Sequence, residues 1–565
     1  MSSISMKLVY QDKYPIVDKY MSDSQIGARR KKNIRNHIFI INGVINEAVN
    51  KGRPIDILMY YYRQCFDTLW LEECINDLYD AGIQDDKLAL TYEVNKKNQV
   101  AIKTPFGITP RVDINQIVLQ GEVLGPLQCS VQVETISKEC IEEEKFLYSY
   151  KQVDIPPLSM IDDLACIADT GRKTVEINSY INAKTSIKKL QFGVDKCYQI
   201  HVGGKEHTTP QLYIDKWEEN KIDGKMTDTC TGKVLMERRE AEVYLGDILS
   251  RDGKNTRNIA ARKNKGLGII KQILDILEGS CLGKYEIEAA LILRSSLFLN
   301  GILTNSEVWY GLKLDDWKQL EQTDEILLRK ILETPTSTPK CMLYLETGCK
   351  PIRFIVQARR VNYLRYILKE DKSSLISQFF HAQNAQSLKN DWALTIRNDL
   401  QELDINLSFE DIKRKSKHAF NSLVAKATTK RALTFLLKEK TNLSKVSHIA
   451  ICELKIQKYM LPHIKNMKTA KFIFQARTRM LDVKGNFGKK VPCQVCHNPN
   501  TTDTQQHLLV CEKLCDNAIV LGGHVPSYED LFSKEVEKVI RIGLILSQQF
   551  ERRKMILNKT AKQSR

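Results

Sequence analysis

Residues 158–169, LSMIDDLACIAD, place two adjacent aspartates inside an otherwise apolar run. A strand interior disfavours Asp, and a buried, unpaired carboxylate is so costly that it is usually neutralised or matched by a cation. Asp162 and Asp163 therefore need either a turn into water, where Asp is common, or bound metal ions. In both cases the apolar, two-Asp, apolar order predicts a β-hairpin with the carboxylates at its bend.

The flanking segments predict alternating strands and helices. DILMYYY (56–62) is typical of a strand, and TLWLEECINDLYDAG (68–82) of a helix that ends at Gly82. LALTYEVNKKNQVAIKT (88–104) predicts a hairpin that turns near residues 95–98, and residues 127–144 have helical spacing. From Asn255 to about Met480 strand patterns nearly vanish and long amphipathic helices dominate. We expect an α+β half followed by a helical half.

The charge of the chain is strongly positive and unevenly distributed. The 565 residues carry a formal net charge of +17, which is unusual for a metabolic enzyme and indicates a polyanionic partner. Residues 421–480 contain thirteen Lys or Arg against only Glu439 and Glu453, a local net charge of +11. Two further stretches, 255–274 and 351–369, are rich in Lys and Arg and could contact phosphates.

The cysteine count and the N-terminal residues indicate the cellular compartment of the protein. Fifteen cysteines is an odd number, and the first residues have no apolar core of the kind a signal peptide needs. No uncharged run approaches the roughly 18 residues that span a bilayer. We expect an intracellular protein, cytoplasmic and/or nuclear, with mostly buried, reduced thiols and no membrane partner. The sequence does not indicate an oligomeric state.

A cysteine–histidine group near the C-terminus has the spacing C-x2-C-x10-H-x3-C. The group comprises Cys493, Cys496, His507 and Cys511. Two thiolates from one tight turn, with His and Cys one helical turn apart, suit a closed tetrahedral Zn²⁺ site. His497 and Cys515 are the alternative ligands.

Six short segments follow one another between about residues 22 and 244. They are SQIGARRKKNIRNH (24–37), YYYRQCFDTLW (60–70), QGEVLGPLQCS (120–130), MIDDL (160–164), KKLQFGVDKC (188–197) and YLGDI (244–248). In this order they resemble the fingers, palm and thumb entry of reverse transcriptases from non-LTR, target-primed retrotransposons. In that family a cysteine–histidine knuckle also lies beyond the thumb. The resemblance implies an RNA-directed DNA polymerase that uses an RNA template, a DNA primer, dNTPs and two Mg²⁺ ions.

The resemblance also implies site residues and a domain order. Asp162 and Asp163 correspond to catalytic, Mg²⁺-binding carboxylates. The implied substrate-binding residues are Gln25, Arg29, Gln120, Gly121, Gly125 and Lys196. The expected domains are a right-hand polymerase palm with partial fingers (1–254), a thumb-like helical region (255–335), a basic helical connector (336–485), a zinc knuckle (486–520) and a helical tail (521–565).

The sequence departs from the family at Tyr61. The first palm strand of the family begins its motif with a metal-binding Asp, and a tyrosine stands there in this chain. A phenol, with an unperturbed pKa near 10, is a poor Mg²⁺ ligand. Asp56 should lie on the opposite strand face, and Asp67 is better placed to cap the following helix. We therefore expect weak or absent polymerase activity.

Two alternative functions remain open, and two parts found in the family are expected to be absent. The chain could instead be a non-catalytic nucleic-acid-binding protein derived from a retroelement, or, less consistently with its knuckle, an RNA-templated RNA polymerase. We expect an N-terminally truncated copy, because the family's first finger segments would lie upstream. We also expect no endonuclease, because no spaced Asp/Glu/Lys cluster follows Cys511.

Overall fold

The structure is a computed structural model in which two compact units are formed by separate parts of the chain. It describes all residues except 1–2, 64, 66–68, 97, 115–124, 205–209, 223–224, 462–466, 516–526 and 564–565. The first unit combines Met1–Arg257, Val308–Gly311 and Leu364–Arg397, and the second combines Asn258–Glu307, Leu312–Tyr363 and Asn398–Arg565. Helices and strands mix in the first unit, whereas the second is helical, so the expected mixed α and β class is confirmed.

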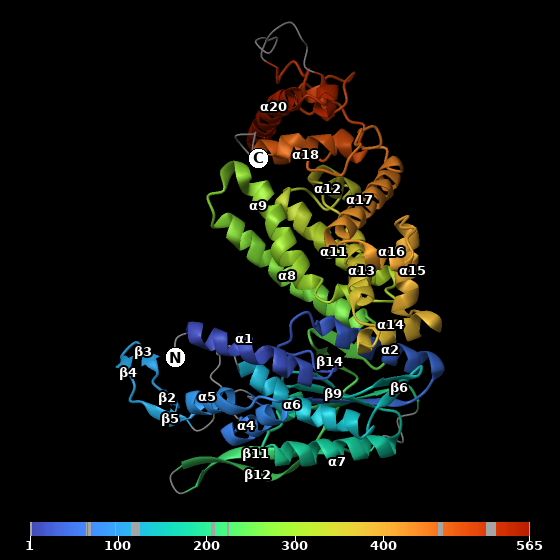
Figure 1. Ribbon diagram of the computed structural model, residues 1–565. Helices are drawn as coiled ribbons and strands as arrows, with labels where there is room; N and C mark the ends of the chain where they lie inside the picture. Colours follow the sequence, from blue (N-terminus) through green and yellow to red (C-terminus); the bar gives the residue numbers. More distant parts are fainter. Residues whose placement is uncertain are drawn as a thin grey trace. The chain divides into compact units, whose positions relative to one another are not determined.

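A five-stranded sheet of order β13-β10-β1-β9-β8 forms the centre of the first unit (Figure 1). Its strands are β1 (Ile55–Tyr61), β8 (Leu158–Met160), β9 (Asp163–Ala168), β10 (Tyr198–Val202) and β13 (Glu237–Arg238). β1 lies antiparallel between β9 and β10, and only the β10–β13 pair is parallel. The apolar run at the start of β1 suits this central position, because both faces of its first residues are buried.

Two helices, α6 (Gly125–Glu142) and α7 (Gly171–Ile187), cover one face of the sheet. Leu58 and Tyr60 of β1 and Leu164 of β9 belong to the same buried cluster as Val133 of α6 and Ile177 of α7. Because side chains alternate along a strand, the odd-numbered residues of β1 and β9 point to the other face. That second face therefore carries Tyr61 and Asp163.

The two aspartates lie at a tight turn between β8 and β9, as the sequence predicted. Met160 pairs with Asp163, which leaves Ile161 and Asp162 as the connecting residues. Ile161 has a φ of 59°, a left-handed conformation that is strained for a β-branched residue. Such a turn needs support from its surroundings.

Support for the turn comes from the segment around Gln25. Ile26 N donates to Ser159 O at 3.0 Å, so this segment runs beside β8. The buried Gln25 Oε1 accepts from Gly27 N at 2.7 Å and from Ile161 N at 3.3 Å. At Gly27 a Cβ would lie 2.4 Å from Ile161 N, so only glycine fits.

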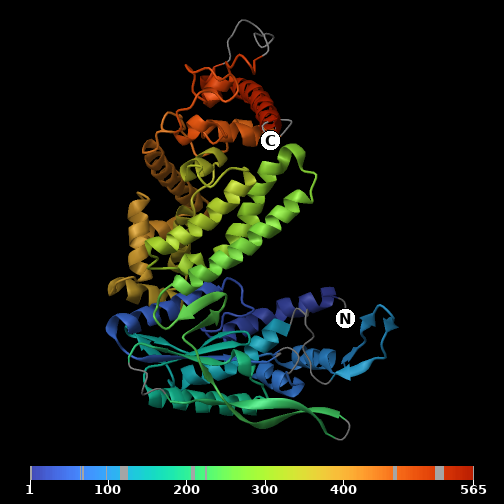
Figure 2. The ribbon, with the colours of Figure 1, turned by 180° about the vertical axis from the view of Figure 1, so that it is seen from behind.

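Further helices and short hairpins surround this sheet in the first unit. The helices are α1 (Ser3–Tyr20), α2 (Ile34–Lys51), α4 (Leu71–Asp80), α5 (Asp85–Asn95) and α14 (Leu375–Ala385). The short strands are β2 (Asn98–Val100), β3 (Lys103–Thr104), β4 (Gly107–Ile108), β5 (Val112–Ile114), β6 (Tyr148–Tyr150), β7 (Val153–Ile155), β14 (Ala241–Tyr244) and β15 (Asp247–Ser250). The longer β11 (Tyr213–Ile222) and β12 (Lys225–Leu235) form an extended hairpin that is plain from behind in Figure 2.

The prediction of a hairpin over residues 88–104 is wrong in its first half. Residues Asp85–Asn95 form helix α5, and strand structure begins only at Asn98. Asp85 and Asp86 lie in the first turn, where negative charge favours a helix, and Thr91 Oγ1 donates back to Lys87 O at 2.7 Å. Helix packing against α4 thus overrides the alternating apolar pattern.

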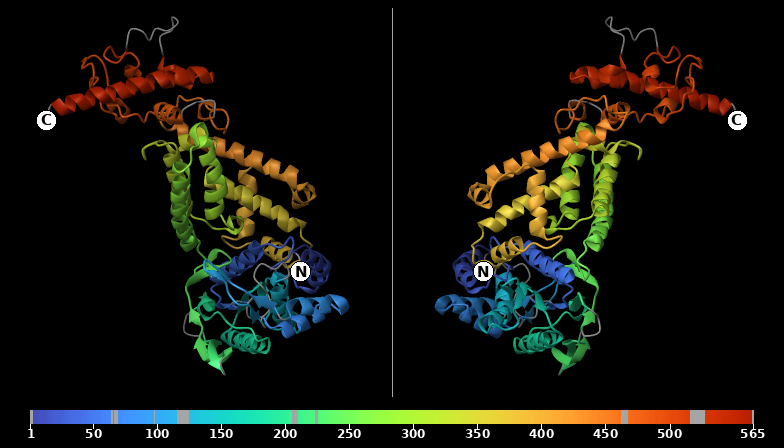
Figure 3. Two further views of the ribbon diagram at one scale, coloured as in Figure 1. Left: turned by 90° about the vertical axis from the view of Figure 1, so that its left-hand side faces the viewer. Right: turned by 90° about the vertical axis from the view of Figure 1, so that its right-hand side faces the viewer.

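The second unit is built from helices that are joined by buried ion pairs. Its main helices are α8 (Thr256–Glu278), α9 (Glu286–Leu293), α11 (Leu314–Ile331), α12 (Lys340–Thr347), α16 (Phe409–Arg414), α17 (Lys417–Thr441), α18 (Met467–Arg477), α19 (Gln505–Leu508) and α20 (Val536–Gln563). The residues of α13 (Ile352–Lys369) and α15 (Trp392–Glu402) are divided between the two units. α17 and α20 are its long helices, drawn orange and red in Figure 3. Arg294 pairs with Asp324 at 2.6 Å with almost no exposure of either side chain.

Two further findings concern cysteines and membranes. Cys65 and Cys129 form a disulfide inside the first unit's core, a pair that the sequence did not indicate. Most thiols were expected to be buried and reduced, and Cys74, Cys140, Cys166, Cys197 and Cys341 are free and buried.

Within the described residues no helix combines the length and apolar character that crossing a bilayer requires.

We predict that Gly27→Ala destabilises the first unit. The added Cβ would meet the Ile161 backbone, so the substitution should lower the free energy of unfolding by about 1–3 kcal/mol, as overpacking does. Urea unfolding followed by circular dichroism measures this change. Gly268→Ala in α8 is the control, because a Cβ there meets nothing within 4 Å and should be tolerated. Unchanged unfolding of Gly27→Ala would contradict the described packing.

Candidate functional site

The register of β1 and β9 decides which side chains meet at the aspartate pair. Tyr61 lies directly opposite Asp163, and Tyr62 N donates to Asp162 O at 3.1 Å. The end of β1 therefore lies beside the doublet. The residue at the position where the family has an aspartate is a tyrosine in direct cross-strand contact.

Lys196 and Gly193 complete the surroundings of Tyr61. The Lys196 ammonium lies 3.8 Å from the centre of the Tyr61 ring, a cation–π contact. At Gly193 a Cβ would lie 2.7 Å from Tyr61 Cδ1, so the ring packs closely against this glycine. Gly193 N also donates to Tyr61 O at 2.8 Å. Tyr61 is thus held on two sides, by Gly193 and by Lys196 of the chain itself.

The two carboxyl groups are poor places for negative charge without a cation. Burial raises the pKa of Asp163 to about 7; repulsion by Asp162 adds to this rise and attraction by Lys196 opposes it. Burial also raises the pKa of Asp162, while hydrogen bonding, including a bond with the Tyr61 side chain, and attraction by Lys196 act against it. Two adjacent carboxyls of this kind gain from a bound cation.

The remaining nearby aspartates do not supply a third ligand. Asp56 lies on the opposite sheet face, as predicted, where it is buried and accepts from Thr174 Oγ1 at 2.8 Å and contacts His201 Nδ1 at 2.8 Å. Asp67 lies outside the described residues. Among the residues that the structure describes, only the cysteine–histidine group near the C-terminus brings three or more potential metal ligands together.

A cavity of about 480 Å³ opens on the sheet face that carries Tyr61 and Asp163. Lys196 lines it, as do residues that the sequence analysis did not single out, namely Tyr198, Arg239 and Glu242. Arg239 Nη1 pairs with Glu242 Oε2 at 2.6 Å. The charged run RRE (238–240) was the available signal, but only the fold brings it to this face. The cavity is thus lined by aromatic surface and by side chains of both charges, with Asp163, Asp195 and Glu242 beside Lys196 and Arg239.

The other residues predicted to bind substrate differ in where they lie relative to the cavity. Gln25 is buried, and its amide supports the aspartate turn. Arg29 pairs with Asp18 at 2.8 Å and donates to Gln25 O at 3.0 Å. Gly125 is buried at the start of α6, whereas Gln120 and Gly121 lie outside the described residues. Lys196 alone of the described residues in this set lines the cavity, and for all of them substrate contact stays a prediction.

The predicted zinc ligands form one cluster. One ligand atom from each of Cys493, Cys496, His507 and Cys511 lies within 4.8 Å of those of the other three. Cys496 Sγ lies 3.4 Å from His507 Nε2, and Cys493 Sγ lies 3.9 Å from Cys511 Sγ. Three thiols and one imidazole at these separations fit a closed tetrahedral Zn²⁺ site.

A buried ion pair ties this cluster to α20. Arg553 Nη2 lies 2.9 Å from Asp503 Oδ2, and both side chains are almost fully buried. The same Asp503 oxygen accepts from Lys484 N at 2.9 Å. Of the alternative zinc ligands, Cys515 donates to Leu509 O at 3.1 Å, and neither it nor His497 belongs to the cluster.

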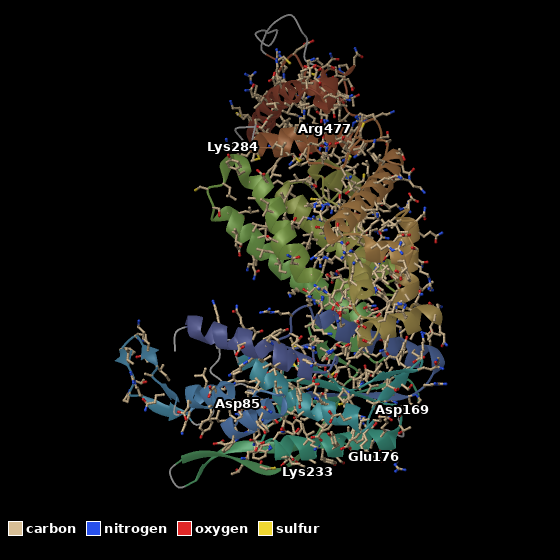
Figure 4. The ribbon with its side chains drawn as sticks, in the orientation of Figure 1. Asp85, Asp169, Glu176, Lys233, Lys284 and Arg477 are labelled. Carbon is tan, nitrogen blue, oxygen red and sulfur yellow. A yellow bond between two sulfur atoms is a disulfide. The ribbon has the colours of Figure 1, made fainter. Side chains whose placement is uncertain are left out.

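Several cations that the sequence offered for phosphate contact are used inside the second unit. Arg360 pairs with Asp399 at 2.6 Å and is buried, and Arg353 pairs with Glu321 at 2.5 Å. Arg477, labelled at the end of α18 in Figure 4, pairs with Glu346 at 3.0 Å and is buried. A count of positive residues along the chain therefore overstates the charge available to a polyanion.

Helix α17 retains an exposed basic face. Its buried stripe includes Phe420, Val424 and Leu436, at helical spacing. Exposed cations occupy other positions of the same helix, at Lys417, Lys426, Lys430, Arg431 and Lys438. This exposed face is the best-supported location for the excess positive charge of residues 421–480.

Comparisons with known proteins gave remote likenesses to solved structures. No protein-family model and no curated protein matches the chain. Telomerase of Candida tropicalis in complex with a fragment of telomeric RNA covers 72% of the chain at 10% identity and a TM-score of 0.34. The apo enzyme of that species covers 74% of the chain at 9% identity and a TM-score of 0.32. Telomerase of Candida albicans covers 70% of the chain at 10% identity and a TM-score of 0.30. The chain spans 55%, 60% and 57% of these structures in turn, and similarity at this level does not indicate a shared function.

We predict that the purified protein contains about one equivalent of Zn²⁺ and that Cys496→Ser releases it. Metal analysis by mass spectrometry measures the content. Cys515→Ser is the matched control and should keep the metal, because its thiol lies outside the cluster. Full zinc occupancy in Cys496→Ser would refute this ligand set.

We predict that RNA affinity falls steeply with added salt, and that charge removal on α17 reduces this dependence. Replacing Lys426, Arg431 and Lys438 by Gln should flatten the plot of log affinity against log salt by up to about two units of slope. Gln replacement of the internally paired Arg353 is the control for altered charge. An unchanged slope in the α17 variant would place the binding face elsewhere.

Proposed function

We propose that the chain is a reverse transcriptase of non-LTR retrotransposon type, an RNA-directed DNA polymerase, with an impaired polymerase site. The observation that carries the proposal is the register that sets Tyr61 opposite Asp163 at a two-aspartate hairpin. The order of six family-like segments and Lys196 beside the hairpin support it. The palm, thumb, connector and knuckle assignments, an intracellular location and a transposable-element origin belong to the same proposal.

Under this proposal Asp162 and Asp163 hold Mg²⁺. Their raised pKa values and adjacent positions fit a divalent cation. In phosphoryl transfer a pair of such ions stabilises the charge that develops on the attacking and leaving oxygens. A second ion does not fit equally well, because Tyr61 offers a phenol where a third carboxylate would be needed.

The residues of the chain would act on the substrates through charge and shape. Lys196 lines the cavity and can attract the phosphates of a nucleotide or of a primer end, whereas Arg239, which also lines it, is already paired with Glu237 and Glu242. Lys196 first has to leave its contact with the Tyr61 ring, which weakens that attraction. RNA template, DNA primer and dNTPs are thus the proposed partners, with a catalytic rate lowered by orders of magnitude.

A non-catalytic nucleic-acid-binding protein is the second candidate. The contact of Lys196 with Tyr61 favours it, because an internal cation already occupies the neighbourhood of the carboxylates. The exposed basic face of α17 would serve both candidates equally. Catalysis is therefore the property that separates them.

Primer extension on an RNA template tests the proposal. We predict little Mg²⁺-dependent DNA synthesis by the unmodified chain and a measurable gain in Tyr61→Asp, since this change restores a carboxylate opposite Asp163. Tyr61→Asn is the matched control, because it removes the ring without adding charge. The gain should vanish when Asp162→Asn is added to Tyr61→Asp.

Two outcomes would contradict parts of this proposal. Robust synthesis by the unmodified chain that Asp162→Asn abolishes would show that the site works with Tyr61 in place. RNA binding without synthesis in any variant would favour the non-catalytic candidate.

A further inference from the structure

The hairpin between Asn98 and Ile114 ends in an exposed aromatic tip. β2 pairs with β5 and β3 pairs with β4, so the chain runs out and back along two short ladders. Both Figure 1 and Figure 2 show β3 and β4 extending away from the five-stranded sheet of the same unit. Phe106, at the turn between β3 and β4, is 100% exposed.

The neighbours of Phe106 are apolar and exposed as well. Ile102 is 63% exposed and Ile108 is 71% exposed. Single exposed apolar residues are ordinary on protein surfaces, but three of them within residues 102–108 make this tip a candidate contact site. None of these three residues belongs to the two buried clusters described for the first unit.

The turn holds Phe106 in a defined place. Thr104 Oγ1 accepts from Phe106 N at 3.2 Å and donates to Gly107 O at 3.0 Å. Gly107 has a φ of 133°, which other residues rarely adopt, and Pro105 fixes its own φ. Folding therefore already fixes the backbone that carries the ring. Binding of a partner then costs little further backbone entropy.

The charge around the ring is predominantly positive in sequence. Residues 96–112 contain Lys96, Lys97, Lys103 and Arg111 and no Asp or Glu, and Asp113, on β5, is the one acidic residue of the hairpin itself. Lys103 lies directly opposite Ile108, and residues opposite each other share a strand face. Lys103 and Arg111 are exposed. An exposed aromatic ring with exposed cations on both sides of it in the sequence matches a base next to phosphates better than it matches an apolar protein groove.

We propose that Phe106 stacks on an unpaired base of single-stranded nucleic acid while Lys103 and Arg111 contact neighbouring phosphates. The site is distinct from the cavity at Asp163 and depends on the proposed function only in that the chain binds nucleic acid. Stacking uses the π face of the ring, which every base can meet, so the contact is independent of sequence. A base inside a duplex is already stacked and cannot use it.

Binding of fluorescein-labelled oligouridine, about 20 nucleotides long, is measured by anisotropy beside a labelled RNA duplex of equal length. Phe106→Ala and Phe106→Leu should both weaken oligouridine binding by about 5-fold or more, the lower limit for one lost base–aromatic stack. Phe106→Trp should bind as tightly as the native chain or more tightly. None of the three changes should weaken duplex binding by more than about 2-fold.

The controls separate this inference from its alternatives. Tyr79→Ala removes another exposed aromatic ring of the first unit, on α4, and should leave oligouridine binding unchanged. Leucine keeps apolar area and loses the π face, so native-like oligouridine binding by Phe106→Leu would overturn stacking. Equal losses for single strand and duplex would overturn it as well. If the native chain binds neither RNA, the proposed function fails together with this site.

Discussion

The antiparallel pairing of β1 with β9 is the constraint on which the candidate site depends. It sets Tyr61 against Asp163 and brings the end of β1 to the strained turn at Ile161. The turn in turn relies on the buried amide of Gln25 and on the missing side chain of Gly27. A segment more than a hundred residues upstream thereby fixes the position of the two carboxyl groups. The aspartate pair therefore depends on Gln25 and Gly27 as well as on its own turn.

Electrostatics explains why this site is unusual. Burial makes ionisation of Asp162 and Asp163 costly, and the nearest positive charge comes from Lys196, which also lies over the Tyr61 ring. A phenol at position 61 supplies neither the negative charge nor the ligand oxygens of a carboxylate. Under the proposed function, the pair of aspartates would gain from one divalent ion, and a second ion would have to be held largely by substrate and water.

The sequence predicted the parts of the fold that depend on local patterns. The Asp162–Asp163 bend, the β1 strand and the opposite facing of Asp56 follow from period-2 alternation and from the cost of burying charge. Spacing alone also predicted that Cys493, Cys496, His507 and Cys511 would lie together. Helix α5 was missed because tertiary packing overrode alternation, and the internal pairing of Arg353 and Arg360 was missed because partners distant in sequence leave no local signal. The closeness of Lys196 to Tyr61 likewise emerges only from the fold.

Counting the divalent ions held at the aspartate pair tests the central claim most directly. Manganese titration of the zinc-loaded protein, followed by electron paramagnetic resonance, can compare the native chain with Tyr61→Asp, using Asp162→Asn to identify the ions bound at this site. We expect the native chain to hold a single Mn²⁺ there and Tyr61→Asp to hold one more. Two Mn²⁺ ions at the aspartates of the native chain would contradict this expectation.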